Sequence, residues 1–157
     1  MSDPTDLPGV SAWPEPVTFE RLQEAVAALG LTLTPTKSQR LSTRIEDNVI
    51  EMSVARGKTT VVRVLGLSAT RVPAEQEAAL ATFANNWHRE RTWPTLLWTP
   101  TEEGNLALRS VYTIDFTAGA TDQQLSTAVR VGISASTKGL NSARDALQKG
   151  TTEPELG

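Results

Sequence analysis

The sequence predicts an α+β fold, in which an antiparallel sheet of about five strands carries helices packed on one face. Three observations lead to this class. Helical and strand-like hydrophobic patterns follow one another in the order α-β-β-β-α-β-β-α. Short turn sequences separate neighbouring strand patterns, which is typical of antiparallel pairing. The length of 157 residues suits one domain with a single core.

Residues 1–17 precede the first regular element. Their closely spaced prolines favour an extended or disordered lead-in, and we expect Trp13 to anchor its end to the domain. A helix is predicted over 18–29, because apolar residues recur there every three or four positions. Thr18 is expected to cap this helix, and Gly30 follows its last turn in the position that favours glycine.

Three strand patterns come next and predict an antiparallel meander. Apolar residues alternate with polar ones in 41–45 and again in 50–54, and Asp47-Asn48 is the turn expected between them. A further turn at 56–58 leads to 60–70, where apolar residues occupy both odd and even positions. We therefore predict that the third strand is the most buried of the three.

A second helix is predicted to begin at Ala74 and to end before Pro94. Its apolar residues, Trp87 among them, recur at helical spacing. Arg89 and Arg91 fall in its last turn, where the helix dipole favours cations. Pro94 cannot continue the helix, because its ring has no N–H to donate and clashes with the preceding turn.

Two strands and a last helix complete the pattern. A short strand is predicted at 96–98 and a longer one at 106–116, where the apolar residues have even numbers. Thr121 or Asp122 is expected to cap the helix that follows. Its apolar residues share one face as far as Ser136.

The C-terminal part of the chain carries a weaker pattern. From about Lys138 the sequence is polar and sparse in large apolar residues, so we expect a short further helix at 140–149. The tail at 150–157 is expected to fray. The predicted organisation is therefore a lead-in at 1–17, a single domain at 18–149 and a flexible tail.

Composition narrows the classes of function. The chain has no cysteine, which excludes disulfides, thiolate metal sites and cysteine nucleophiles. Its net charge of −3 provides no general attraction to nucleic acid or to anionic membranes. No apolar run approaches the length of about 18 residues that a membrane span requires. We therefore expect a cytoplasmic protein with no membrane association.

The common catalytic motifs are absent from the sequence. It contains no glycine-rich nucleotide loop, no HExxH zinc motif and no nucleophile elbow. We therefore predict no catalytic residues, no metal site and no cofactor. One alternative is an enzyme with an unrecognised site built on Asp115, Glu51 or His88. Another is a nucleic-acid-linked regulator, which would require five arginines to share one face: Arg40, Arg44, Arg63, Arg89 and Arg91.

The segment ANNWHRERTWP, residues 84–94, contains the only histidine and two of the four tryptophans. We interpret it as a structural motif in which Trp87 anchors the helix end to the sheet. The neighbouring asparagines are expected to bond to backbone groups that the helix end leaves unpaired, and Trp93 to rest against an arginine. The motif comprises Asn85, Asn86, Trp87, His88, Trp93 and Pro94.

This segment and the elements after it resemble the YbjN-like family, whose members are described as bacterial sensory transduction regulators. The family pattern is Asn-x-Trp-Asn at a helix end. Asn85 and Trp87 match it, whereas His88 stands where the family often has a second asparagine. The resemblance covers roughly residues 18–136 in layout. It implies the fold of type III secretion chaperones, which dimerise and bind extended segments of other proteins, and it implies no catalytic residues.

The resemblance and the absence of catalytic motifs together predict a non-enzymatic binding or regulatory domain. We expect a chaperone-like protein–protein interaction module with a role in signalling or stress regulation, which has a protein partner, forms a homodimer and does not bind nucleic acid. Such a module should expose an apolar patch. The candidate residues for this partner-binding surface are Val49, Met52, Leu97, Trp98 and Val111.

Overall fold

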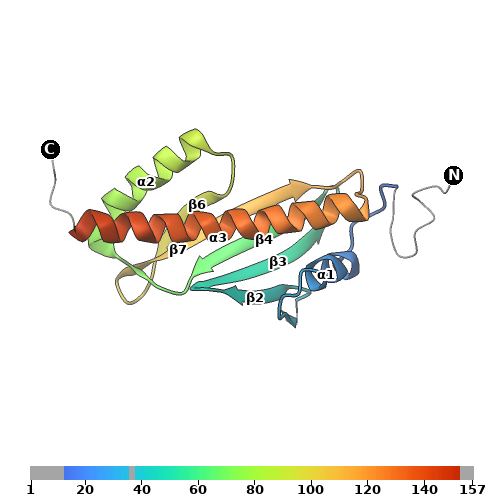
Figure 1. Ribbon diagram of the computed structural model, residues 1–157, viewed down its shortest axis with the longest axis horizontal. Coiled ribbons are helices and arrows are strands. Elements are labelled where there is room, and N and C mark those ends of the chain that lie inside the picture. The colour runs from blue at the N-terminus through green and yellow to red at the C-terminus, as the bar shows by residue number, and fades with distance from the viewer. Residues whose placement is uncertain (1–12, 36–37, 153–157) are drawn as a thin grey trace.

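A single antiparallel sheet with helices along one of its faces forms the molecule (Figure 1). The computed structural model describes residues 13–35 and 38–152. Within them the strands are β1 (Thr34–Pro35), β2 (Leu41–Ile45), β3 (Asn48–Arg56), β4 (Thr60–Ser68), β5 (Val72–Pro73), β6 (Thr95–Pro100) and β7 (Asn105–Asp115). The helices are α1 (Phe19–Ala27), a 3₁₀ turn (Ala74–Gln76), α2 (Glu77–Glu90) and α3 (Asp122–Thr152).

The predicted fold class and element order are confirmed. The strands lie in the order β1-β2-β3-β4-β7-β5, and β6 also pairs with β7. The sheet is therefore larger than expected, because the described residues add the two-residue strands β1 and β5 at its edges. The pairs β2–β3 and β3–β4 form the predicted meander.

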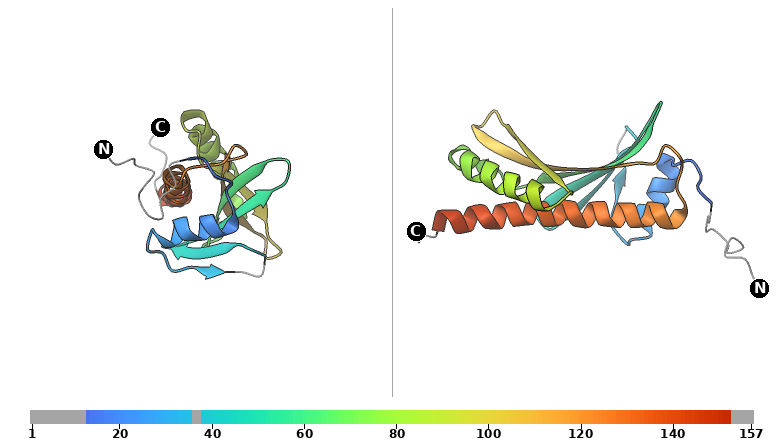
Figure 2. Two further views of the ribbon diagram at one scale, coloured as in Figure 1. Left: turned by 90° about the vertical axis from the view of Figure 1, so that its right-hand side faces the viewer. Right: turned by 90° about the horizontal axis from the view of Figure 1, so that it is seen from above.

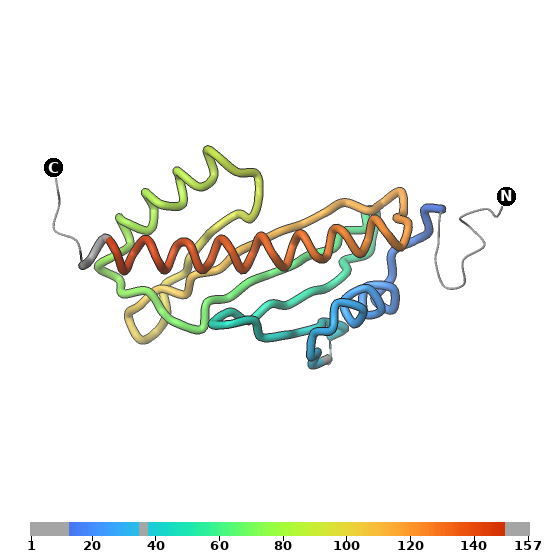
Figure 3. The backbone as a smooth tube through the Cα atoms, viewed as in Figure 1, coloured from blue at the N-terminus to red at the C-terminus, as the bar shows by residue number. Residues whose placement is uncertain are grey.

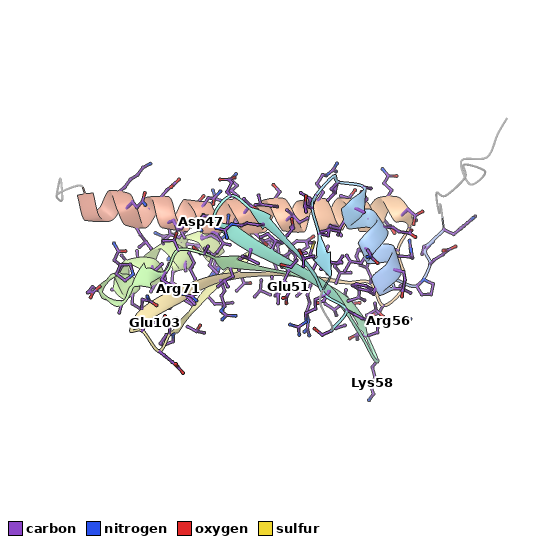
Figure 4. The ribbon with its side chains drawn as sticks, turned by 90° about the horizontal axis from the view of Figure 1, so that it is seen from below. Asp47, Glu51, Arg56, Lys58, Arg71 and Glu103 are labelled. Carbon is purple, nitrogen blue, oxygen red and sulfur yellow. The ribbon has the colours of Figure 1, made fainter. Side chains whose placement is uncertain are left out.

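The helices form one layer. α3 crosses the sheet over β3, β4 and β7, with α1 beside its N-terminal part and α2 beside its C-terminal part (Figure 2). None of the described helices lies on the opposite face of the sheet. The two long hairpins bend away from α3 at their tips, so this helix-free face is curved inward (Figure 2). Lys58, at the tip of the β3–β4 hairpin, points away from the body of the protein (Figure 4).

The lead-in is held at the N-terminal end of α3. Glu15 exchanges two backbone hydrogen bonds with Ala120, with N···O distances of 3.1 and 2.9 Å. Arg21 of α1 donates to the carbonyls of both residues and pairs with Asp122 at 2.8 Å. Trp13, which was expected to anchor the lead-in, is 70% exposed, and the backbone bridge between Glu15 and Ala120 also holds the segment. Residues 1–12 lie outside the described part.

The turn between β2 and β3 differs by one residue from the prediction. It consists of Glu46 and Asp47, and Glu46 adopts a φ of +55°. Asn48 is the first residue of β3, opposite Ile45, and is fully buried. Asn48 is buried because of a tertiary contact: its side chain donates a hydrogen bond of 3.0 Å to the side chain of Asn141 in α3.

α3 corrects the expectation for the C-terminal part of the chain. It is one helix of 31 residues, rather than a helix that ends near Lys138 with a separate short one after it. Thr121 and Gln124 form a capping box, with reciprocal N–H···O distances of 2.9 and 3.0 Å. Beyond Ser136 the buried stripe continues through Leu140, Ala143 and Leu147. Residues 153–157 of the predicted tail lie outside the described residues.

Close packing of α3 on the sheet depends on small residues. A Cβ atom at Gly132 would lie 2.6 Å from Cδ1 of Tyr112 and 2.9 Å from Cγ2 of Val64. In β4, a Cβ atom at Gly66 would lie 2.9 Å from Cδ1 of Leu140. Both glycines therefore let helix and sheet approach more closely than any larger residue would permit.

The core consists of two hydrophobic clusters along α3. One joins α1 and the N-terminal half of α3 to strands β2, β3, β4 and β7, and it includes Leu22, Ile50, Val64 and Val129. The other joins α2 and the C-terminal half of α3 to β6 and β7, and it includes Leu80, Trp87, Leu108 and Leu140. α3 therefore links the two halves of the domain.

Candidate protein-binding surface

The helix-free face of the sheet carries large aliphatic side chains in adjacent rows. Side chains alternate along each strand, so the neighbours of the buried Ile50, Val64 and Leu96 point to this face. Leu97, Arg109, Leu67 and Val49 are opposite one another in sequence across β6, β7, β4 and β3. In the next row, Val111 is opposite Leu65. We call Val49, Leu65, Leu67, Leu97 and Val111 the open face; all five are half-buried.

Three of the five residues expected to form a partner-binding surface lie on the open face: Val49, Leu97 and Val111. Met52 does not, because its position in β3 turns it toward the helices, where it is fully buried. Trp98 also faces the helix side, and its indole N–H donates to Glu77 of α2 at 3.0 Å. Along a strand, only residues an even number of positions apart share a face. Leu97 and Trp98 are consecutive, and Val49 and Met52 are three positions apart, so neither pair can lie on one surface.

Leu65 and Leu67 complete the open face and were not among the residues predicted for it. Both belong to a strand that was predicted to be buried on both faces. In the structure one face of that strand is in the core, with Val62 and Val64 fully buried, while Leu65 and Leu67 are accessible. The alternation along β4 places Leu65 and Leu67 on the face opposite Val62 and Val64, but it does not reveal which of the two faces the helices cover.

Trp87 anchors the end of α2. The side chain is 5% exposed, stacks on Phe83 with ring centroids 5.9 Å apart, and is covered by the Arg91 guanidinium at 4.2 Å from its centroid. The arginine therefore lies over Trp87, and not over Trp93 as expected. Trp93 instead packs its ring against the edge of Tyr112, at 5.0 Å between centroids.

The contact between the end of α2 and the sheet is made by His88. Its Nε2 accepts a hydrogen bond of 2.9 Å from the backbone N–H of Leu96 in β6. Asn85 and Asn86 were expected to supply such bonds, but both are exposed and neither side chain has a hydrogen-bond partner within the described residues. Pro94 packs on α3, where its Cγ would lie 2.8 Å from a Cβ at Gly139.

The three residues considered for an unrecognised enzyme site do not converge. His88 lies on the helix side of the sheet, whereas Glu51 points to the other side and pairs with Arg40 at 3.1 Å. Asp115 accepts a hydrogen bond of 2.8 Å from the backbone N–H of Thr117. The hydrogen bond from the Thr117 hydroxyl is the main cause of a lowered pKa for Asp115, and the backbone contact acts in the same direction. Each group is thus engaged in a separate local contact.

No group of three or more acidic or histidine side chains within residues 13–35 and 38–152 is arranged to hold a metal ion. Of the five arginines considered for nucleic acid, Arg40 and Arg44 are paired with acidic residues, with Arg44 3.6 Å from Asp47. Arg63 is exposed on the sheet, and Arg91 lies at the end of α2. These side chains do not form one basic face.

A polar cluster ties the C-terminal half of α3 to the β2–β3 turn. Arg144 donates to Asn48 at 2.7 Å and to Ser68 at 2.9 Å, and it also donates to Asn141. Asp47 lies 4.0 Å from the Arg144 guanidinium and accepts a hydrogen bond from the Thr70 hydroxyl. The Thr70 hydroxyl is the main cause of a lowered pKa for Asp47, and Arg144 and Arg44 act in the same direction.

The Asp47→Asn variant is expected to be less stable than the wild type at pH 7, with a difference that shrinks in acid. The pKa of Asp47 is lower in the folded than in the unfolded protein, where it is about 3.9. Its stabilisation is therefore present above about pH 4 and is lost as the pH falls through the folded value. Urea unfolding of both proteins between pH 3 and pH 7 measures this. A difference that is constant across this range would contradict the prediction.

Comparisons with known proteins agree with this architecture. A family model described as "YbjN: Putative bacterial sensory transduction regulator" matches residues 18–143. The chain is similar to the crystal structure of YbjN, "a putative transcription regulator from E. coli", with a TM-score of 0.66 and 12% identity, over 88% of this chain and 96% of that chain. No curated protein matches the sequence.

A second similar structure is a chain of the HopA1–SchA chaperone–effector complex. It has a TM-score of 0.52 and 14% identity, and the match covers 85% of this chain and 99% of that chain. At such identities the likeness shows a shared fold, including the chaperone-like layout that the sequence predicts. Among the helices described, α3 included, none is long and apolar enough to cross a membrane.

Proposed function

The chain belongs to the YbjN family, and on that premise we propose that it is a non-enzymatic regulatory domain that holds a partner protein against its open face. The mode of binding is chaperone-like, in that a folded sheet offers an apolar surface to another polypeptide. The role lies in signalling or stress regulation. We place the protein in the cytoplasm, a compartment that the absence of cysteine fits.

The open face is the observation that carries this proposal. An antiparallel sheet with one solvated face normally shows polar residues there. Here Val49, Leu67 and Leu97 share one row, and Leu65 and Val111 the next, so large aliphatic groups extend across four strands. The five side chains are half-buried and adjoin one another, and apolar patches of this kind on a surface mark interaction sites. Glu51 borders the patch beside Leu65, and Arg109 lies within it, between Leu67 and Leu97, so the surface combines aliphatic groups with one cation.

The comparisons with known proteins also support a regulatory, protein-binding role. The family description and the description of the E. coli protein both name a regulator. The other similar structure is a chain of a chaperone–effector complex, which is an assembly of one protein with another. The residues considered for catalysis are engaged in separate contacts, which favours binding over chemistry.

A Leu65→Arg variant tests the proposal. A charge at the centre of the open face should weaken partner binding, while the fold is retained because Leu65 lies on the helix-free face and is only half-buried. Wild type and variant are each used for affinity capture from native cell extract at moderate salt. Proteins retained only by the wild type are identified, purified and titrated against both forms. We expect affinity to fall by roughly tenfold or more.

The matched control is Ser134→Arg, which places the same side chain on the exposed surface of α3. It should capture the same proteins as the wild type. Identical sets of captured proteins for Leu65→Arg and wild type would contradict the proposal. Analytical sedimentation of the wild type and both variants measures their oligomeric states. If the wild type is a dimer and Leu65→Arg is a monomer, the protein bound to the open face is a second copy of this chain.

A further inference from the structure

α1 covers only part of the flank of α3 against which it packs. It has nine residues and α3 has 31, and the two helices meet near their N-terminal ends, where Arg21 pairs with Asp122. Gly30 adopts a φ of +78° after the last turn of α1, and the chain then leads to β1 and β2 (Figure 3). Beyond this turn, α3 continues with no described helix on the same flank.

A groove with a volume of about 540 Å³ opens on this flank, between the end of α1, the end of β2 and the middle of α3. Its apolar part consists of Leu29, Leu31, Ile45 and Ile133. Ile133 is buried in the hydrophobic cluster around α1, and the other three are half-buried and pack against that cluster. Most of the surface that lines the groove is carbon. The groove is therefore a place where the described core reaches the surface.

Two cations stand at the rim of this groove. Arg130 and Lys138 are exposed, and neither forms an ion pair with any residue in 13–35 or 38–152. They lie two turns apart on one side of α3 with Ser134 between them, so roughly 12 Å separates their Cα atoms. Side chains of this length reach a single anion above Ser134 from both sides, while their aliphatic stems line the groove.

A negative charge lies at the opposite end of the groove. The Asn141 amide donates to the Glu46 carboxylate at 3.3 Å, and Asn141 lines the groove 11 residues beyond Arg130. Like charges repel, so a bound anion is favoured near Arg130 and disfavoured near Asn141. The groove therefore offers a cationic position at one end and apolar surface beside it.

We propose that this groove binds a small amphipathic carboxylate of the medium-chain fatty acid class. The head group lies between Arg130 and Lys138, and the alkyl chain lies on the apolar part of the groove. The volume falls within the range of about 300–1,000 Å³ that is typical of small-molecule sites, which combine mainly apolar lining with a few polar groups. A carboxylate fits the rim, since arginine binds this group through two parallel hydrogen bonds.

The charge of the whole chain favours a free acid over a lipid headgroup. A net charge of −3 opposes close approach to an anionic membrane, so the two rim cations meet a dissolved anion more readily than a charged bilayer. The groove is also short, because α3 rises by only about 16 Å between Arg130 and Asn141. This length suits one alkyl chain.

This inference goes beyond the function proposed above. The open face lies on the helix-free side of the sheet, whereas the groove is bordered by α1 and α3 on the other side. The two sites are therefore tested by different variants, and either can fail without the other. A regulatory domain that binds a small acid responds to the concentration of that acid.

Isothermal titration calorimetry with decanoate, below its micelle concentration, measures the binding. Hexanoate has the same head group and four fewer CH₂ groups. Each buried CH₂ group raises affinity by up to roughly fourfold, so hexanoate should bind about tenfold more weakly or worse. Decyltrimethylammonium has the same alkyl chain and a cationic head group. It should also bind about tenfold more weakly or worse, because the rim cations repel it.

Variants of the protein test the same contacts. Arg130→Glu reverses an exposed charge at the rim and should weaken decanoate binding by roughly fivefold or more. Its control is Arg89→Glu, the same change on α2, which should bind like the wild type. Leu31→Gln removes apolar surface from the groove and should weaken binding, whereas Leu33→Gln changes a half-buried residue that does not line it. Leu65→Arg should bind decanoate like the wild type.

The position of the ligand is measured by amide chemical shifts. On addition of decanoate, the largest changes should fall in residues 29–31 and 130–138. Changes centred on the open face instead would overturn the proposal, as would an absence of binding or equal affinity of wild type and Arg130→Glu.

Two further results would replace the proposed ligand with another occupant. One is retention on phosphatidylglycerol vesicles without binding of free decanoate, which would make a lipid surface the ligand. The other is decanoate binding that appears only when residues 2–12 are deleted, which would make the N-terminal segment of the chain the occupant of the groove.

Discussion

The Trp87→Ala variant is expected to lose about 3–5 kcal/mol of unfolding free energy, which is the usual cost of removing a core tryptophan. The indole is 5% exposed and lies in the cluster that joins α2, α3, β6 and β7. Its removal leaves a cavity between Phe83 and the Arg91 guanidinium, which both pack on its ring. For a domain of this size the melting temperature should fall by roughly 6–20 °C, as measured by circular dichroism.

Two matched variants separate packing from other causes. Trp87→Phe keeps an aromatic ring and removes an indole N–H that has no hydrogen-bond partner among the described residues, so its loss should be clearly smaller. Asn86→Ala changes an exposed neighbour and should shift the unfolding free energy by less than about 0.5 kcal/mol. An unchanged midpoint for Trp87→Ala would show that the ring does not anchor the helix.

The Leu140→Ala variant is expected to lose about 2–5 kcal/mol, the range for a buried leucine. Leu140 is fully buried in the middle of α3, in the same cluster as Trp87. Its Cδ1 would lie 2.9 Å from a Cβ at Gly66, so it fills the space above β4 that this glycine leaves. Urea unfolding measures the loss, with an unchanged slope if the variant keeps the same two states.

Lys138→Ala is the control for this helix, because Lys138 is exposed and lies two residues before Leu140. It should change the unfolding free energy by less than about 0.5 kcal/mol. Equal stability of Leu140→Ala and Lys138→Ala would mean that the second half of α3 is not docked on the sheet. Amide hydrogen exchange of residues 140–147 in the wild type gives an independent reading, since a docked helix is protected.

Trp87 and Leu140 show where the sequence pattern was sufficient to predict a core position and where it was not. Trp87 follows Leu80 and Ala84 at helical spacing, so its core position was predicted from local periodicity. Leu140 and Leu147 are separated by small and polar residues, and that stretch was predicted to be only a short helix. Close contact with Gly66 makes a thin apolar stripe sufficient for docking.

The candidate surface was predicted in part for a similar reason. Val49, Leu97 and Val111 were assigned to an exposed patch, and they do face away from the helices. Met52 was included with them although it is fully buried. The alternation along β3 places Val49 and Met52 on opposite faces of the sheet, but it does not reveal which face the helices cover. Leu65 and Leu67 were missed because both faces of β4 are apolar.

By itself, the sequence determined the order of elements, the fold class and the capping of α1 and α3, because periodicity and caps depend on residues a few positions apart. The tertiary structure alone decided the remaining features. Contact with α3 placed Asn48 in a strand rather than a turn, and the path of the chain beyond α2 brought His88 to Leu96. Each of these depends on groups far apart in the chain that meet only when the sheet and its helices are assembled.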